Sequence, residues 1–408
     1  MPSTPEALIA IYEDLHRHPE LGGQEHRTAG IVADHLRTLG YDVTTGVGGT
    51  GVVATLERGA GPTVLLRADM DGLPVREDTG LPYASTATAT TADGKEHPVM
   101  HACGHDVHVT CLLGAAARLV EDREWRGRVL LVFQPDEETG NGARAMVADG
   151  LYERFGKPDV VLGQHVAPLP VGVLGVTPGP AFAASDSLRV VLHGSGGHGS
   201  RPEATVDPVV LGAATVLRLQ TVVAREIAGS DMAVVTVGSF HAGTAPNIIP
   251  DEAVLQLSIR TTDEHVRARV LAAVERIVRG EAAAAGAPRE PEVVTIDGTP
   301  TVVNDAGACA RVTAAFQAAG GHLVVDPGTV TGSEDVGILA DEAGVPCAYW
   351  LLGGADPALF AGATTVEELK RVVGELPSNH SPRFAPLAAP TLESGVAALV
   401  TAARSFLG

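Results

Sequence analysis

Three short and almost uninterrupted apolar runs constrain the fold of this chain more than any other feature. They lie at residues 64–67, 129–133 and 160–163. Strands that are apolar on both sides are typical of a parallel sheet that helices cover on both faces. A helical pattern at 106–120 separates the first two runs, and a strand at 347–352 precedes a closing helix at 386–406. This alternation predicts an α/β fold with a mostly parallel sheet flanked by helices.

The middle of the chain follows a different pattern. The expected order is a strand at 188–193, a helix at 207–226, strands at 232–240 and 253–260, a helix at 264–280 and a strand at 292–296. This β-α-β-β-α-β order predicts a ferredoxin-like unit with an antiparallel sheet. We therefore expect an inserted α+β domain at 182–297 and a first domain made of residues 1–181 and 298–408.

The charge and the cysteine count narrow the class of protein. The chain has 29 basic and 49 acidic residues, which give a formal net charge of −20. Such a surface repels phosphate backbones and argues against a nucleic-acid partner. Four cysteines among 408 residues are too few for a disulfide framework. The N-terminus has no signal-peptide pattern, and no apolar run approaches the roughly 18 residues of a membrane span. These observations predict a cytoplasmic protein without a membrane partner.

Acidic, histidine and cysteine residues gather after the predicted strands, where a parallel sheet places its functional site. The densest cluster, at 100–108, holds Cys103, His105 and two further histidines. Thiolate, imidazole and carboxylate groups are the ligands of zinc and its neighbours. A buried cysteine beside surface histidines is one alternative, and a redox thiol is another, although Cys103 has no resolving partner nearby in sequence. The remaining clusters are ambiguous by themselves, because such residues also form turns and helix caps. They contain Asp69, Asp71, Glu137, Glu138, His165 and His380.

The joint occurrence of these clusters is more informative than any one of them. Five residues then offer protein ligands: Cys103, His105, Glu138, His165 and His380. Five ligands are too many for one catalytic zinc with an open position, but they suit two metals that share a water. Glu137 can move protons while its neighbour Glu138 binds metal.

The predicted insert adds three candidates for substrate binding. His198 lies in a glycine-rich loop, Asn247 precedes a strand, and Arg260 ends one. A histidine and an arginine suit an oxyanion and a carboxylate respectively. A glycine-rich turn, an Asx turn and a surface arginine are the alternatives at these three places.

The chain resembles a known family over most of its length, from about residue 6 to about residue 404. It is similar to the aminoacylase and hippurate hydrolase branch of the metal-dependent amidohydrolases and metallopeptidases. Relatives in that family include carboxypeptidase G, succinyl-diaminopimelate desuccinylase and the auxin–amino acid conjugate hydrolases. The motifs that carry the resemblance occur in order: RADMDGLP, MHACGHDVH, QPDEE, GQH, GSGGHGSRPE, APNIIP, GSED and HSPRF.

The resemblance implies a role for each candidate residue. Cys103, His105, Glu138, His165 and His380 match its metal ligands, for two ions per subunit. Glu137 matches the general base, and Asp71 matches an aspartate that orients a ligand or the base. His198 matches a histidine that one subunit lends to its partner's active site. Asn247 and Arg260 match positions that hold the substrate near its carboxylate.

The resemblance also implies a zinc-peptidase-like catalytic domain with an inserted dimerisation or lid domain, and a homodimer. Other branches have a histidine where this chain has Asp69, and relatives often have a small residue where it has Asp136. An acid beside Glu137 is expected to raise the pKa of that base by like-charge repulsion. Zinc, manganese, cobalt and nickel all fit the ligand set, and Cys103 favours softer ions than magnesium.

We therefore expect hydrolysis of an N-acyl amino acid by a metal-activated water with Glu137 as base. A carboxypeptidase or dipeptidase that cuts short peptides is an alternative with the same machinery. A non-catalytic metal- or ligand-binding homologue is a further alternative, which the presence of every expected residue disfavours.

Overall fold

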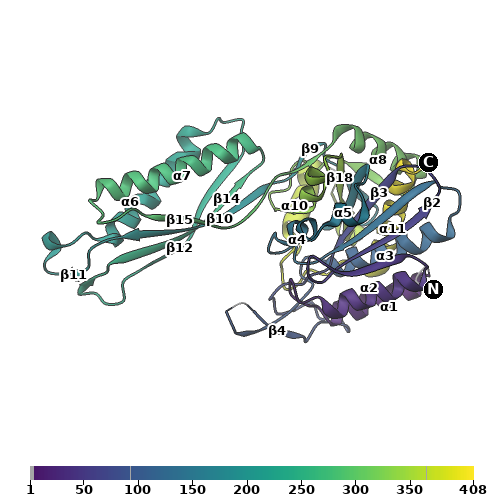
Figure 1. Ribbon diagram of the computed structural model, residues 1–408, viewed down its shortest axis with the longest axis horizontal. Helices are drawn as coiled ribbons and strands as arrows, with labels where there is room; N and C mark the ends of the chain where they lie inside the picture. The colour runs from purple at the N-terminus through teal and green to yellow at the C-terminus, as the bar shows by residue number, and fades with distance from the viewer. Residues whose placement is uncertain (1–3, 92, 364) are drawn as a thin grey trace. The chain divides into compact units, whose positions relative to one another are not determined.

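The computed structural model describes residues 4–91, 93–363 and 365–408. Two compact units make up the chain (Figure 1). The first unit comprises the residues up to Gly179 together with Val303–Gly328 and Asp335–Gly408. The second unit comprises Pro180–Val302 and the short segment Thr329–Glu334. The expected insert at 182–297 lies within this second unit, which extends a few residues further at each end.

An eight-stranded mixed sheet forms the centre of the first unit. Its order is β1 (Asp42–Val47), β2 (Gly51–Arg58), β6 (Gly127–Gln134), β3 (Thr63–Asp69), β7 (Val160–Pro170), β18 (Cys347–Ala355), β8 (Val173–Gly175) and β17 (Leu323–Val325). The central strands β6, β3, β7 and β18 are parallel to one another, whereas β1 and β2 are antiparallel additions at one edge. The predicted α/β class with a mostly parallel sheet is therefore confirmed.

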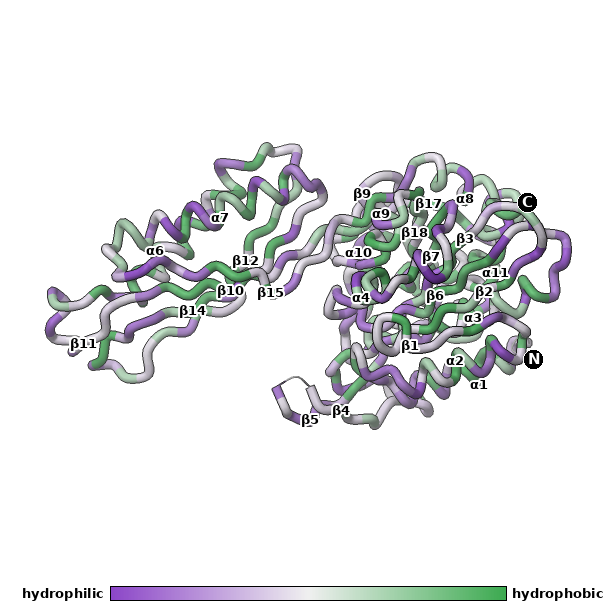
Figure 2. Tube along the Cα trace, viewed as in Figure 1, coloured by the Kyte–Doolittle hydropathy of each residue, from purple (hydrophilic) through white to green (hydrophobic). Residues whose placement is uncertain are grey.

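The central strands are buried on both faces, as their largely apolar sequences require. Figure 2 shows the apolar stretches of this sheet in green. Alternate residues such as Leu66 and Leu131 join one hydrophobic cluster with residues of five helices, one of which is α8 (Ala306–Ala319). The other four are α1 (Pro5–Arg17), α2 (His26–Thr38), α3 (His105–Glu121) and α11 (Ala388–Phe406). The intervening residues, such as Leu65 and Leu130, are equally buried. Helices α4 (Gly142–Ala148) and α9 (Val336–Ala343) also pack on the strands of this sheet.

The second unit has the expected β-α-β-β-α-β order. The elements of this order are β10 (Ala184–His193), α6 (Pro208–Thr221), β12 (Ala233–Ala242), β14 (Glu252–Thr261), α7 (Glu264–Ala284) and β15 (Glu292–Thr299). The strands pair antiparallel in the order β12-β14-β10-β15. Helices α6 and α7 pack on this sheet and share its hydrophobic core.

Helix α6 and the π-helical turn Val222–Glu226 form the one described segment that is long and apolar enough to span a membrane by length and composition alone. One side of it, including Leu211 and Leu219, is buried in the core of the second unit. Its exposed side also carries apolar residues, namely Val209, Val210, Leu217 and Val223. A helix that packs on a soluble core meets the same criterion, so the finding is weak evidence for a membrane span.

Candidate metal centre

The parallel strands of the first unit's sheet bring the acidic clusters together at the carboxyl ends of the strands. Strand β3 ends at Asp69 and β6 ends at Gln134, and these two residues are paired in register. Asp71 and the pair Glu137–Glu138 follow these two strand ends and therefore lie close to each other. The backbone N–H of Glu138 donates a 2.9 Å hydrogen bond to Asp71 Oδ2, which links the two segments.

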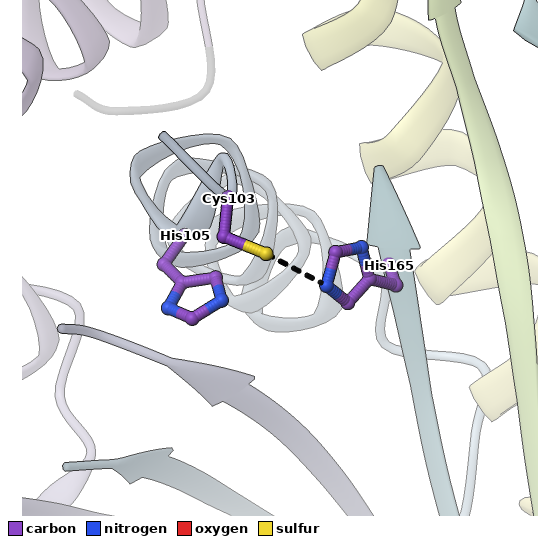
Figure 3. Close-up of side chains that lie close together, drawn as sticks. All are labelled: Cys103, His105 and His165. Carbon is purple, nitrogen blue, oxygen red and sulfur yellow. Dashed lines mark hydrogen bonds between the residues drawn. The ribbon is translucent and has the colours of Figure 1, made fainter. Parts of the chain in front are cut away.

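Helix α3 and strand β7 supply the thiol and two imidazoles. His105 is the first residue of α3, and Gly104 before it has a left-handed φ of 86°. A Cβ at Gly104 would lie 2.4 Å from Val166 Cγ1, so only glycine fits this turn. His165 lies inside β7 rather than one step beyond it, because the strand continues to Pro170. Its Nε2 lies 3.4 Å from Cys103 Sγ (Figure 3).

All five predicted metal ligands lie together. The ligand atoms of Cys103, His105 and His165 are within 4.8 Å of one another, and so are those of Cys103, Glu138 and His380. His380 Nε2 lies 3.3 Å from Glu138 Oε2, and His105 Nε2 lies 3.8 Å from Glu138 Oε1. Two overlapping ligand groups with Cys103 in common are therefore available to two cations.

Two buried atoms at the centre of this cluster test whether a cation fits. His105 Nε2 and Glu138 Oε1 have no hydrogen-bond partner in the described part of the chain. Buried polar atoms are almost always satisfied, so these two atoms call for a group that accepts both lone pairs. A divalent cation does so, and the mixture of thiolate, imidazole and carboxylate suits zinc and neighbouring metals. The residues present therefore fit a metal centre.

Burial controls the protonation of this cluster when no cation is bound. It raises the pKa of the Cys103 thiol well above its usual value. Burial, together with the charges of Asp71 and Asp69, raises the pKa of Glu138 to about 8. Both groups therefore hold protons at neutral pH, and a cation that binds them must displace those protons.

Asp71 and Glu137 flank His105 on opposite ring nitrogens. Asp71 Oδ1 lies 3.2 Å from His105 Nδ1, which turns Nε2 of the ring towards the cluster. Glu137 Oε2 lies 3.8 Å from that Nε2, and the Glu137 side chain is almost fully buried. The placement of Asp71 matches a residue that orients a ligand histidine. The role of Glu137 as base stays a prediction.

Two residues beside the cluster have a left-handed backbone although they are not glycine. They are Asp136, with a φ of 52°, and His380, with a φ of 70°. Such conformations cost of order 1 kcal/mol or more each and persist only where the surroundings impose them. The N–H of Asp136 donates to Glu25 Oε1 at 2.8 Å, and that of His380 donates to the carbonyl of Ala102 at 2.8 Å. Both turns are thereby fixed next to the cluster.

A buried polar network behind the cluster was not predicted from the sequence. Arg67, inside β3, donates to Asp69 at 2.7 Å and to Asp335 at 2.9 Å. It also donates to Gln134 at 2.9 Å, and His108 lies 2.5 Å from the other oxygen of Asp69. A charged residue within an apolar strand was the available signal, since a buried arginine needs buried acceptors.

The second unit separates its three candidate residues into two places. His198 pairs with Ile248 between β11 (Gly197–His198) and β13 (Ile248–Ile249), and the N–H of Gly199 donates to the carbonyl of Asn247 at 2.9 Å. Asn247 and His198 therefore lie together, at the end of the sheet where β14 begins. Arg260 lies near the other end of β14, roughly 26 Å from Glu252 at about 3.3 Å per residue.

The hydrogen bonds of these residues indicate what each can bind. His198 is exposed, and the N–H of Ser200 donates to its Nδ1 at 3.1 Å. When the ring is neutral, its Nε2 therefore carries the proton and is free to donate. Arg260 is half-buried and donates to Ser333 Oγ at 3.0 Å. Within one chain these residues do not form a single site for a small substrate.

Comparisons with known proteins agree with this geometry. The sequence profile described as peptidase family M20/M25/M40 matches residues 65–370. The chain is 37% identical to thermostable carboxypeptidase 1 of Saccharolobus solfataricus over 352 residues, and this alignment covers 85% of each chain. It is 41% identical to the hippurate hydrolase of Campylobacter jejuni over 276 residues, and this alignment covers 67% of this chain and 69% of that one.

A solved structure extends the similarity to the fold. It is a Bacillus subtilis protein described as a dinuclear metal binding peptidase from the M20 family. The two chains are 29% identical, and the TM-score is 0.75 over 97% of this chain and 98% of that one.

Proposed function

This chain belongs to peptidase family M20/M25/M40, and on that premise we propose that it hydrolyses the amide bond of N-acyl amino acids. The convergence of Cys103, His105, Glu138, His165 and His380 beside Glu137 carries the proposal. The hippurate hydrolase of Campylobacter jejuni, whose name describes such a substrate, supports the choice of an acylated amino acid.

Two divalent cations, when bound, supply Lewis-acid activation of the amide carbonyl and of a water molecule. The five ligand residues hold them, with zinc, manganese, cobalt and nickel as the candidates. Asp71 keeps Nε2 of His105 directed at the cations through its 3.2 Å contact with Nδ1. Glu137 takes a proton from the attacking water and passes it to the nitrogen of the leaving amine.

The residues of the second unit bind the substrate. His198 donates from Nε2 to the oxyanion that develops on the amide oxygen. Asn247 and Arg260 hold the carboxylate of the amino acid, which needs a local cation because the net charge of the chain is −20. Since Arg260 lies far along β14 from the other two residues, we infer that they act in different subunits of a homodimer.

The exposed side of α6 supports such a dimer. Val209, Val210, Leu217 and Val223 form an apolar stripe on a helix whose other side is already buried in its own unit. Apolar stripes of this kind are typical of interfaces between subunits. We further propose a cytoplasmic location, because four buried cysteines that form no disulfide among the described residues suit a reducing compartment.

A substrate panel tests the proposed activity. Protein stripped with a chelator and reloaded with one metal at a time is assayed on N-acetyl and N-benzoyl amino acids and on dipeptides. We expect reversible loss of activity on chelation and faster release of amino acids from N-acyl substrates than from dipeptides. Preference for dipeptides would identify a peptidase instead. No hydrolysis of any amide with both cations bound would identify a non-catalytic homologue.

Hybrid dimers test the shared site. His198→Ala and Glu137→Gln proteins are each expected to be inactive, because each dimer lacks one essential group in both sites. Mixed dimers are expected to recover about a quarter of the wild-type kcat, since one site in each hybrid combines both intact residues. Measurement of kcat after mixing, unfolding and refolding checks this. A mixture of His198→Ala with His198→Asn is the control. If the first mixture recovers no more activity than the control, His198 acts within its own subunit.

An apolar pocket beside His165 suggests the preferred acyl group. Ala167 lines it and lies two residues after His165, hence on the same face of β7. Leu359, Leu376 and Phe384 form further walls, and the volume is about 280 Å³. Because the pocket belongs to the first unit alone, we propose that it holds the acyl group while the second unit binds the carboxylate.

Leu359→Asp is expected to reduce kcat/KM for N-benzoyl substrates about tenfold and to leave N-acetyl substrates nearly unchanged. The reason is that Leu359 lines the pocket, where a charge disfavours an apolar group. Steady-state kinetics on the two substrates measure the effect. Leu369→Asp, at another exposed leucine of the same unit that does not line the pocket, is the control. An equal loss on both substrates would argue against an acyl pocket.

A further inference from the structure

His108 is a fourth buried histidine beside the metal cluster. It lies one turn after His105 on α3, and its ring stacks on that of His105 with centroids 5.3 Å apart. It also meets the ring of His165 edge-on at 4.7 Å. Its ligand atom lies within 4.8 Å of those of Asp69 and His105, so distance alone leaves a metal-binding role open.

The hydrogen bonds of His108 decide against metal binding. The backbone N–H of Val166 donates to His108 Nε2 at 2.8 Å. An amide N–H is always a donor, so Nε2 uses its lone pair here and carries no proton. Nδ1 therefore carries the ring proton and donates it to Asp69 Oδ1 at 2.5 Å. Both ring nitrogens are occupied, and neither has a lone pair left for a cation.

The far end of this chain of bonds is rigid. The second oxygen of Asp69 accepts from Arg67 at 2.7 Å, and Arg67 is anchored in turn by Asp335 at 2.9 Å. All of these side chains are fully buried. Asp69 is thus fixed before it meets His108, and His108 fixes the backbone of β7 at Val166, next to His165. The bond joins the two elements that carry His105 and His165.

We propose that His108 is a positioning residue that ties β7 to α3 and sets the spacing of the His105 and His165 imidazoles for the two cations. Its Nδ1–H tautomer also prevents it from competing for a cation. Asp69, where other branches of the family have a histidine, then serves as the acceptor for this tautomer instead of as a ligand. The inference rests on the two-cation site of the proposed function, but not on amide hydrolysis.

Nuclear magnetic resonance on the wild-type protein tests the ligand assignment. The protein is labelled with ¹⁵N-histidine and loaded with ¹¹³Cd²⁺. We expect cadmium coupling to ring nitrogens of His105 and His165, none to His108, and a protonated Nδ1 with an unprotonated Nε2 on His108. Cadmium coupling to His108, or a proton on its Nε2, would overturn the proposal. This readout needs neither a variant nor activity.

Cation affinity of two variants tests the positioning role. His108→Phe keeps an aromatic ring between its neighbours but removes both hydrogen bonds. We expect it to bind zinc at least tenfold more weakly than wild type by competition with a chromophoric chelator. His108→Asn keeps an acceptor and a donor, and we expect it to recover part of that affinity.

The control separates positioning from general destabilisation. His322→Phe removes the 3.1 Å hydrogen bond of a histidine to Ser394 in the same unit, away from the metal cluster. We expect it to bind zinc as tightly as wild type. Wild-type affinity in His108→Phe, or an equal loss in His322→Phe, would contradict the proposal. Failure of the substrate panel with this cation binding intact would count against amide hydrolysis and not against the role of His108.

Discussion

Replacement of Glu137 by glutamine is expected to remove nearly all turnover while both cations remain bound. The amide keeps the size of the side chain but cannot take a proton from water. General base catalysis contributes about 10²- to 10⁴-fold, so we expect kcat to fall by at least a hundredfold. The five predicted ligands are untouched, and metal analysis after gel filtration is expected to find the wild-type content.

Glu124→Gln is a suitable control, because Glu124 is an exposed glutamate outside the cluster. It is expected to keep wild-type kcat. If Glu137→Gln kept more than a tenth of the wild-type turnover, another group would have to be the base. If the variant lost metal as well as activity, Glu137 would be a metal ligand. Its Oε2 lies 3.8 Å from His105 Nε2, which is close enough for that role.

Replacement of Arg67 by methionine is expected to cause the largest loss of stability of any single change proposed for this chain. Arg67 is almost completely buried and balances the carboxylates of Asp69 and Asp335. Methionine fills similar space but leaves those acids buried with their charge uncompensated. Removing one partner of a buried pair typically costs about 3–5 kcal/mol of unfolding free energy. Urea unfolding of the metal-free protein measures this loss.

Arg371→Met provides the comparison. Arg371 forms an ion pair with Glu375 at 2.7 Å, but both side chains are 63% exposed. Exposed pairs contribute about 0–1 kcal/mol, so the unfolding midpoint is expected to change little. Similar unfolding midpoints for the two variants would show that Asp69 and Asp335 are uncharged in the folded protein and that Arg67 does not stabilise it by neutralising them.

Much of the fold follows from the hydrophobic pattern. The strands β3, β6 and β7 are apolar on both faces, so their place at the centre of a parallel sheet was predictable. The edge strand β1 and its neighbour β2 were not predicted. Strand β1 (DVTTGV) carries polar and exposed residues, and its pairing with β2 is antiparallel. The length of β7 was also underestimated, since Pro168 and Pro170 interrupt its pattern while the strand continues.

In the site, too, features carried by short motifs could be predicted, whereas contacts between residues far apart in the sequence could not. That the five candidate ligands lie together was predictable, because their residue types are rare and their clusters follow strands. The bond between His108 and Val166 was not, because it joins a helix to a backbone amide 58 residues later. The separation of Arg260 from His198 and Asn247 depends on the length of one strand, which the motifs do not record.

The strand order has a consequence for biosynthesis. In the completed sheet β7 lies between β3 and β18, although β18 begins only at Cys347. While the ribosome makes the whole second unit, the apolar edge of β7 therefore lacks its permanent neighbour. Unpaired apolar strand edges attract other chains. During that interval the edge of β7 in the nascent chain is open to pairing with other chains, and truncations before Cys347 are expected to aggregate.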